Sequence, residues 1–285
     1  MNNNHKQSAT KSQSPDASAC DQRPPIDDGK IPVNGLLDDF WRALALLSRI
    51  PVSMRCDFRP EAIARSVWCW PFVGLFIAGV AIIPAFLTDI LIGNSAVTAI
   101  MATLVLVLLT GAMHEDGIAD CADGFGGGQD RQRKLEIMRD SRIGTYGVIA
   151  LVLCLALRIV LLSLASDSGS MAAILIVMAV TSRAAIPVVM HFLDPARMDG
   201  LGKGAGRPEL LMVVGGIGVA LLLVLVVAGP MAVITSVMAM MVAVVLVGWI
   251  AKSQIGGHTG DVLGMTQIAS ELFVGIAFVA VIQGT

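Results

Sequence analysis

The stretch that decides the fold is Leu210–Ile250, with the sequence LLMVVGGIGVALLLVLVVAGPMAVITSVMAMMVAVVLVGWI. It runs for 41 residues without one Asp, Glu, Lys or Arg. A helix that crosses the hydrocarbon core of a bilayer needs about 20 apolar residues, so this stretch is long enough for two crossings. Gly229-Pro230 lies near its middle, and a Gly-Pro pair marks a turn because Pro ends a helix. The sequence therefore predicts two consecutive membrane spans that meet at Gly229.

The whole chain shares this apolar character. Of its 285 residues, 55% are hydrophobic and 15% are charged, and the mean hydropathy is +0.75. Soluble domains contain about 25% charged residues, so the composition excludes a water-soluble enzyme and an intrinsically disordered protein. A net charge of -2 and an aromatic content of 5% are not those of a nucleic-acid-binding surface, which needs basic and stacking side chains. We expect an integral membrane protein whose partner is the lipid bilayer, with no nucleic acid.

Helical spans recur along the chain. Seven apolar runs are long enough to cross a membrane: Val67–Leu87, Ala96–Met113, Tyr146–Ala165, Met171–Leu193, Leu210–Ala228, Met231–Ile250 and Val262–Ile282. Before them, apolar residues recur at helical spacing from Leu36 to Leu47 behind Asn34 as N-cap, which predicts an amphipathic helix on the membrane surface. The predicted fold class is an all-α integral membrane protein, a polytopic bundle of about seven transmembrane helices plus this N-terminal helix.

Lys and Arg are concentrated in alternate loops. The polar residues 1–33 are expected to be a disordered cytosolic tail, and residues 34–285 a single polytopic domain. Within that domain, basic residues mark the loops 114–145, 194–209 and 251–261, whereas the intervening loops contain neither Lys nor Arg. By the positive-inside rule, the N-terminus and these three loops are predicted to lie in the cytoplasm, together with the chemistry.

An acidic cluster follows the second predicted span. Asp116, Asp120 and Asp123 are spaced i, i+4, i+7, which places them on one face of a helix, where like charges repel. Carboxylates in such a pattern suit Mg²⁺, which binds a few carboxylates together with substrate phosphates and water. Glu115 is a fourth candidate ligand. The alternative is a solvated acidic segment; the position beside an apolar helix, where unpaired charge is costly, favours the metal.

Two further polar segments are candidates for phosphate binding. Arg139 and Arg142 are spaced i, i+3 around Asp140, and Arg suits bidentate contacts to phosphate; the alternative is that they only obey the positive-inside rule. The glycines of the segment 256–261 permit close approach of its backbone to a ligand. Within it, His258 and Thr259 are candidate phosphate contacts, and Asp261 is a candidate metal ligand.

Three charged residues lie inside predicted spans. Arg158, Arg183 and Glu271 interrupt otherwise apolar helices, and such residues face the bundle interior or pair with one another because charge is costly in hydrocarbon. Their pattern fits a structural Arg–Glu clamp and a substrate contact equally well.

Several of these blocks, in this order, resemble the signature of the cobalamin synthase family. The most specific block is GAMHEDGIADCADG at 111–124, and the others are LSRIPV at 47–52, PFVG at 71–74, EIMRDSRIG at 136–144 and TGDVLG at 259–264 with Glu271. The resemblance extends over most of Phe40–Ile282. Ile118 and Cys121 stand where Leu and Thr are more common, and neither change touches the charged set.

The resemblance implies an enzyme of the cell inner membrane, an adenosylcobinamide-GDP ribazoletransferase that uses Mg²⁺. Such an enzyme transfers the adenosylcobinamide phosphate group to α-ribazole, or to its 5′-phosphate, and releases GMP. Other enzymes of cobalamin synthesis are candidate partners. Matched residue by residue, the first acidic motif falls on Glu115, Asp116, Asp120 and Asp123, the second block on Arg139, Asp140, Ser141 and Arg142, and the third on Asp261.

Displacement at phosphorus is mostly positioning and charge neutralisation, which gives these residues expected roles. The four carboxylates of the first motif are expected to hold Mg²⁺ against the diphosphate, and Arg139 and Arg142 to neutralise the remaining charge. Ser141 and Asp261 are expected to bind the substrate as well. Asp123 or Asp140 is the candidate base that accepts the proton of the attacking hydroxyl.

Other functions share parts of the pattern. Asp116 and Asp120 resemble the paired aspartates of prenyltransferases, and Asp120 with Asp123-Gly124 resembles CDP-alcohol phosphotransferases, although the Ala-Arg pair expected three residues later is missing. A cation transporter is a further alternative, but a transport path needs paired carboxylates in several spans, and only Glu271 has such a position.

Overall fold

The computed structural model describes residues 35–52, 58–165, 167–197, 200 and 204–284. The predicted tail 1–33 and the predicted N-cap Asn34 lie outside these residues. The described elements are helices, with one isolated β-bridge between Pro195 and His258. The helices are α1 (Leu36–Leu47), α2 (Pro60–Ser66), η1 (Val67–Cys69), α3 (Trp70–Ile92), α4 (Ser95–Thr110), α5 (Met113–Gly127), α6 (Arg131–Ile137), α7 (Thr145–Ser163), α8 (Ser168–Phe192), α10 (Leu210–Ile255) and α11 (Gly260–Gly284).

The predicted all-α polytopic fold is confirmed. Five helices of the described chain are long and apolar enough to cross a membrane, and α4 with α5, bent by 87°, adds a sixth when the pair is counted as one span. Helix α10 has 46 residues and breaks at Gly229, whose φ of 80° is left-handed. With its two arms counted separately, the crossings match the seven predicted from the sequence.

The two arms of α10 fold back on each other. The segment before α10 and the segment after it lie side by side, because the amide of Ala196 donates to the carbonyl of His258 at 2.8 Å and the amide of His258 donates to that of Asp194 at 2.9 Å. Both ends of α10 therefore lie at the same end of the bundle, and Gly229 lies at its turn. The Gly-Pro split predicted from the sequence is confirmed.

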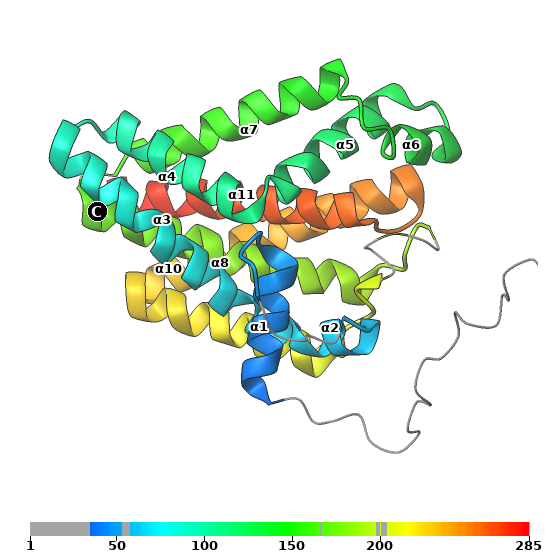
Figure 1. Cartoon of the computed structure of the whole chain (residues 1–285), viewed down its shortest axis with the longest axis horizontal. Helices are drawn as coiled ribbons and strands as arrows, with labels where there is room; N and C mark the ends of the chain where they lie inside the picture. Colours follow the sequence, from blue (N-terminus) through cyan, green and yellow to red (C-terminus); the bar gives the residue numbers. More distant parts are fainter. Residues whose placement is uncertain (1–34, 53–57, 166, 198–199, 201–203, 285) are drawn as a thin grey trace, which may run out of the picture. The chain divides into compact units, whose positions relative to one another are not determined.

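Helix α8 forms the centre of the bundle (Figure 1), where it packs against α3, α10 and α11. Most of its span is buried, whereas α7 and α10 expose most of theirs to the surroundings. Helices α3 and α8 approach closely at Gly74, where a Cβ would collide with the carbonyl of Ala179. Small residues at such crossings allow close packing where the hydrophobic effect does not drive association.

The polar segments gather at the end of the bundle that holds α6, opposite the C-terminus (Figure 1). The side chain of Arg131 on α6 donates to the carbonyls of Ile255, at 2.7 Å, and Ala196, at 2.6 Å. Gly206 lies against the carbonyl of Pro60 at the start of α2. The candidate loops predicted from their basic residues thus share one end, which we call the basic end.

The corner between α4 and α5 departs from the predicted straight span Ala96–Met113. Helix α4 ends at Thr110, and Gly111 and Ala112 both adopt left-handed backbone, with φ of 65° and 58°. Irregular backbone at membrane depth is tolerated where protein covers it; here the side chain of Arg49 lies against Gly111. The corner turns α5 so that the acidic cluster lies on a helix, as predicted, although most of the loop expected at 114–145 is helical.

Helix α1 confirms the predicted N-terminal helix, with Gly35 as its N-cap. Leu44 and Leu47 are buried in the core, whereas Leu36 and Leu37 are exposed. The helix therefore divides its apolar side chains between the bundle and the surroundings, and its location on the membrane surface stays a prediction.

Candidate active site

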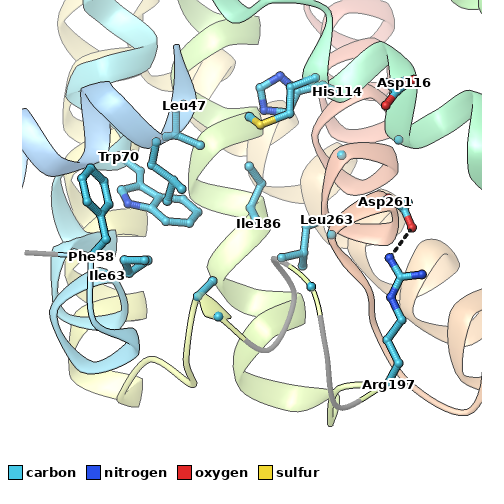
Figure 2. Close-up of a pocket in the computed structure, with 18 residues that line it drawn as sticks. Leu47, Phe58, Ile63, Trp70, His114, Asp116, Ile186, Arg197, Asp261 and Leu263 are labelled. Carbon is cyan, nitrogen blue, oxygen red and sulfur yellow. Dashed lines mark hydrogen bonds and ion pairs between the residues drawn. The ribbon is translucent and has the colours of Figure 1, made fainter. Parts of the chain in front are cut away.

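A cavity of about 530 Å³ opens at the basic end, between α1, α3, α5, α8 and α11 (Figure 2). One wall is apolar and is formed by Leu47, Ile63, Trp70, Ile186 and Leu263. The opposite end is charged and is formed by Asp116, Arg197 and Asp261. Ligand sites in proteins have this size and this division between an apolar lining and a few polar groups.

The charged end is held together by contacts between α11 and the segment after α8. Arg197 forms an ion pair with Asp261, with 3.3 Å between Nη2 and Oδ2, and the hydroxyl of Thr259 donates to the same oxygen at 3.0 Å. The second terminal nitrogen of Arg197, Nη1, is buried and has no hydrogen-bond partner among the described residues. Arg197 therefore retains a donor for an anionic ligand in the cavity.

Two members of the predicted acidic cluster belong to this end. Asp116 lines the cavity and is exposed. Asp120 lies one turn further along α5 and does not line the cavity, but the charges of Asp116, Asp261 and Asp123 repel its own and Arg197 attracts it. Asp116 and Asp261 therefore line the charged end beside Arg197, with Asp120 next to them on α5.

Asp123 faces another helix. Its carboxylate accepts the backbone N–H groups of Gly144, at 2.6 Å, and Gly147, at 2.8 Å. Gly144 is the N-cap of α7 and has no side chain to satisfy the first amides of that helix, so Asp123 supplies the cap from α5. Gly147 permits the approach, because a Cβ there would collide with the Asp123 carboxylate. Asp123 does not line the cavity, so its metal ligation and its role as base stay predictions.

Glu115 is turned in the opposite direction, into the bundle. It is buried and accepts a hydrogen bond from Arg158 of α7, with 2.8 Å between Nη1 and Oε1. Arg158 also pairs with Glu271 of α11 at 2.8 Å, and the side-chain amide of Gln267 donates to Glu271. Arg158 and Glu271 thus form the predicted clamp together with Glu115, which the sequence assigned to the metal. Arg183 donates instead to the carbonyl of Ala179, at 3.3 Å.

The second block lies outside the cavity. Arg139, Ser141 and Arg142 are exposed between α6 and α7. Arg142 pairs with Asp140 at 2.7 Å and lowers the pKa of Asp140 to about 2. Phosphate binding by Arg139, Ser141 and Arg142, and the role of Asp140 as base, stay predictions.

The third segment contributes Asp261 to the cavity but not the two residues before Gly260. His258 and Thr259 are both buried, and burial lowers the pKa of His258. Thr259 caps α11, because its hydroxyl accepts the amide of Val262 at 3.3 Å. Both residues position Asp261 rather than line the cavity, so direct substrate contacts from His258 and Thr259 stay predictions.

The sequence reasoning missed two parts of this site. Arg197 was counted only as evidence of membrane orientation, and its pairing with Asp261 joins residues far apart in the chain. Trp70 and its apolar neighbours were assigned to a span, because apolar residues that line a cavity have the same pattern as those that face a core.

The donor set at the charged end fits Mg²⁺. Asp116, Asp120 and Asp261 offer only oxygen ligands, and Mg²⁺ usually binds one or two carboxylates together with substrate phosphates. Across the described residues, no group of three or more His, Cys, Asp or Glu side chains forms a ready-made metal site. A magnesium ion here would therefore need phosphate oxygens of a substrate to complete its coordination.

Comparison with known proteins gives a consistent result. The sequence model of the family described as cobalamin-5-phosphate synthase matches residues 39–279. Three similar proteins are each named adenosylcobinamide-GDP ribazoletransferase. They come from Sinorhizobium medicae (43% identical over 252 residues, 83% of this chain and 94% of the relative), Bradyrhizobium diazoefficiens (35% over 242 residues, 85% and 93%) and Rhizobium meliloti (42% over 253 residues, 85% and 96%). No solved structure matches the chain.

Proposed function

Because the chain belongs to the cobalamin-5-phosphate synthase family, we propose that it transfers adenosylcobinamide phosphate from adenosylcobinamide-GDP to α-ribazole or its 5′-phosphate. The products are adenosylcobalamin, or its 5′-phosphate, and GMP. The observation that carries the proposal is the cavity in which Asp116, Asp261 and Arg197 meet an apolar wall. Such a cavity accepts a molecule that is charged at one end and apolar at the other.

The reaction joins the ribose hydroxyl of the acceptor to the phosphorus that carries cobinamide. The bond from that phosphorus to the bridging oxygen of the diphosphate breaks, GMP leaves with the bridging oxygen, and the hydroxyl loses its proton. Arg197 neutralises part of the phosphate charge through Nη1, which has no partner among the described residues. The hydroxyl proton passes to a carboxylate at the charged end of the cavity.

Asp116 and Asp120 would hold Mg²⁺, with Asp261 beside them. When bound, the ion neutralises the diphosphate and stabilises GMP as leaving group. The N-terminal turns of α5 and α11 both line the cavity, and the positive ends of the two helix dipoles favour an anion at the same place.

We place the basic end in the cytoplasm and the bundle in the cell inner membrane. The placement follows from the positive-inside rule and from the gathering of the basic loops at one end. The buried charges Glu115, Arg158 and Glu271 pair with one another, as expected of a structural clamp rather than of a transport path. The family match disfavours the prenyl and CDP-alcohol alternatives.

A direct assay tests the proposal. Protein purified in detergent or reconstituted in liposomes is expected to convert adenosylcobinamide-GDP and α-ribazole to adenosylcobalamin and GMP, both measured by liquid chromatography. The same assay with α-ribazole 5′-phosphate identifies the better acceptor. Absence of product with both acceptors, from folded protein at saturating Mg²⁺, would refute the proposed activity.

We expect turnover to depend on Mg²⁺, because the carboxylates at the charged end do not complete the coordination of the ion by themselves. Excess EDTA is expected to stop turnover, and added Mg²⁺ to restore it. Because the carboxylates need substrate phosphates to complete the site, Mg²⁺ alone is expected to leave the melting temperature nearly unchanged, whereas Mg²⁺ with adenosylcobinamide-GDP raises it. Full activity in EDTA would contradict the metal, and tight binding of Mg²⁺ alone would contradict its dependence on substrate.

A further inference from the structure

The apolar wall of the cavity lies opposite the charged end (Figure 2). Leu47 of α1, Ile63 of α2 and Trp70 of α3 are each at most 5% exposed, and Ile186 of α8 continues the wall. The indole N–H of Trp70 donates to the hydroxyl of Ser66 at 3.3 Å. The only polar atom of these four side chains thus has a partner within the protein, so these four offer a ligand apolar contact and no hydrogen bond. His114 also lines the cavity, and its Nε2 has no partner among the described residues.

This chemistry distinguishes between the parts of the proposed substrates. The corrinoid carries amide groups around its rim, and guanine carries donors and acceptors along its edge. Either group would lose hydrogen bonds to water at this wall without replacement, which is costly. The dimethylbenzimidazole base of α-ribazole presents an apolar ring and two methyl groups, and it loses few hydrogen bonds to water at this wall.

Size and order along the cavity agree with this assignment. A cavity of about 530 Å³ encloses a drug-sized molecule, and a benzimidazole nucleoside has that size. The corrinoid donor is several times larger. In the nucleoside the apolar base lies at one end and the reacting hydroxyl at the other, in the same order as the wall and the carboxylates.

We propose that Leu47, Ile63, Trp70 and Ile186 form the subsite for the aromatic base of the acceptor nucleoside, while the corrinoid stays outside the apolar part of the cavity. The inference rests on the proposed function, since it requires the acceptor to be a nucleoside. It assigns these residues to acceptor selection and predicts that the donor does not contact them.

Substitution of Ile63 tests the subsite. Ile63→Phe narrows the wall and is expected to raise the KM for α-ribazole about tenfold or more, because a pocket discriminates single methylene groups by about this factor. The KM for adenosylcobinamide-GDP is expected to change less than about twofold. The imidazole riboside, which lacks the second ring, is expected to lose less activity than α-ribazole.

Two further variants make the result decisive. Ile63→Ala removes contacts without adding bulk, and it tests the subsite even if Ile63→Phe does not fold. It is expected to weaken the binding of α-ribazole more than the binding of the imidazole riboside. Ile83→Phe is the matched control, because Ile83 is 63% exposed on α3 and lies outside the cavity; its kinetic constants are expected to equal those of the parent. An increase confined to the KM of the donor, or equal effects on all acceptors, would overturn the subsite. An inactive parent enzyme would instead refute the proposed function.

Discussion

Asp116→Asn is expected to reduce kcat/KM by about 100-fold or more while the protein stays folded. The substitution preserves the shape of the side chain but removes the charge that faces the cavity. Asp116 is exposed, so no buried contact is lost and the melting temperature in detergent is expected to stay within a few degrees of the parent. Steady-state kinetics with both substrates, together with thermal unfolding, measures the two effects separately.

The four carboxylates of α5 are expected to fall into two classes. Asp120→Asn is expected to behave like Asp116→Asn, because Asp120 shares the charged end. Asp123→Asn and Glu115→Gln are expected to reduce stability first, since Asp123 caps α7 and Glu115 pairs with Arg158. Glu136→Gln is the matched control, because it removes the same charge from an exposed position on α6.

Two results would contradict this division of the four α5 carboxylates into two classes. Near-normal turnover by both Asp116→Asn and Asp120→Asn would remove the charged end of the cavity from the mechanism. Stable but inactive Asp123→Asn would return Asp123 to the reacting groups, as the sequence pattern alone suggested.

The acidic cluster shows how far the sequence reasoning reaches. The spacing i, i+4, i+7 predicted a helix with three carboxylates on one face, and α5 confirms the helix. Periodicity gives the angle of a side chain around the helix axis, but not which neighbour lies at each height along it. Asp116 meets the cavity, whereas Asp123, two turns further on, meets the first turn of α7. Only the packing of α5 against α7 and α11 separates these roles.

The membrane spans show the same limit. Gly229-Pro230 interrupts an uncharged stretch, and both residues favour a break, so the two arms of α10 were predictable. The corner at Gly111 and Ala112 was not, because one glycine inside an apolar run is compatible with a continuous helix. Arg197 was missed for a related reason. Its pairing with Asp261 depends on the bridge between Pro195 and His258, a contact between distant segments that local patterns do not contain.

Arg158→Leu is expected to destabilise the bundle by about 3–5 kcal/mol, because it leaves two buried carboxylates without their partner. Arg158 is 3% exposed and holds Glu115 and Glu271 from two other helices, each at 2.8 Å. Unpaired charge at this position is costly in a membrane bundle. The expected result is a low yield of folded protein and a clearly lower melting temperature, measured by thermal unfolding in detergent.

The double variant Glu115→Gln, Arg158→Leu separates folding from chemistry. It keeps Glu271 as the counter-charge of the buried Arg183, so most of the lost stability is expected to return. Neither substituted residue lines the active-site cavity, so turnover is expected to return to within about tenfold of the parent. Cys154→Ala, one turn earlier on α7 and half-buried, controls for any change to that helix. A stable but inactive Arg158→Leu variant would contradict the clamp and assign Arg158 to the substrate, because loss of a structural ion pair cannot abolish turnover while leaving the bundle equally stable.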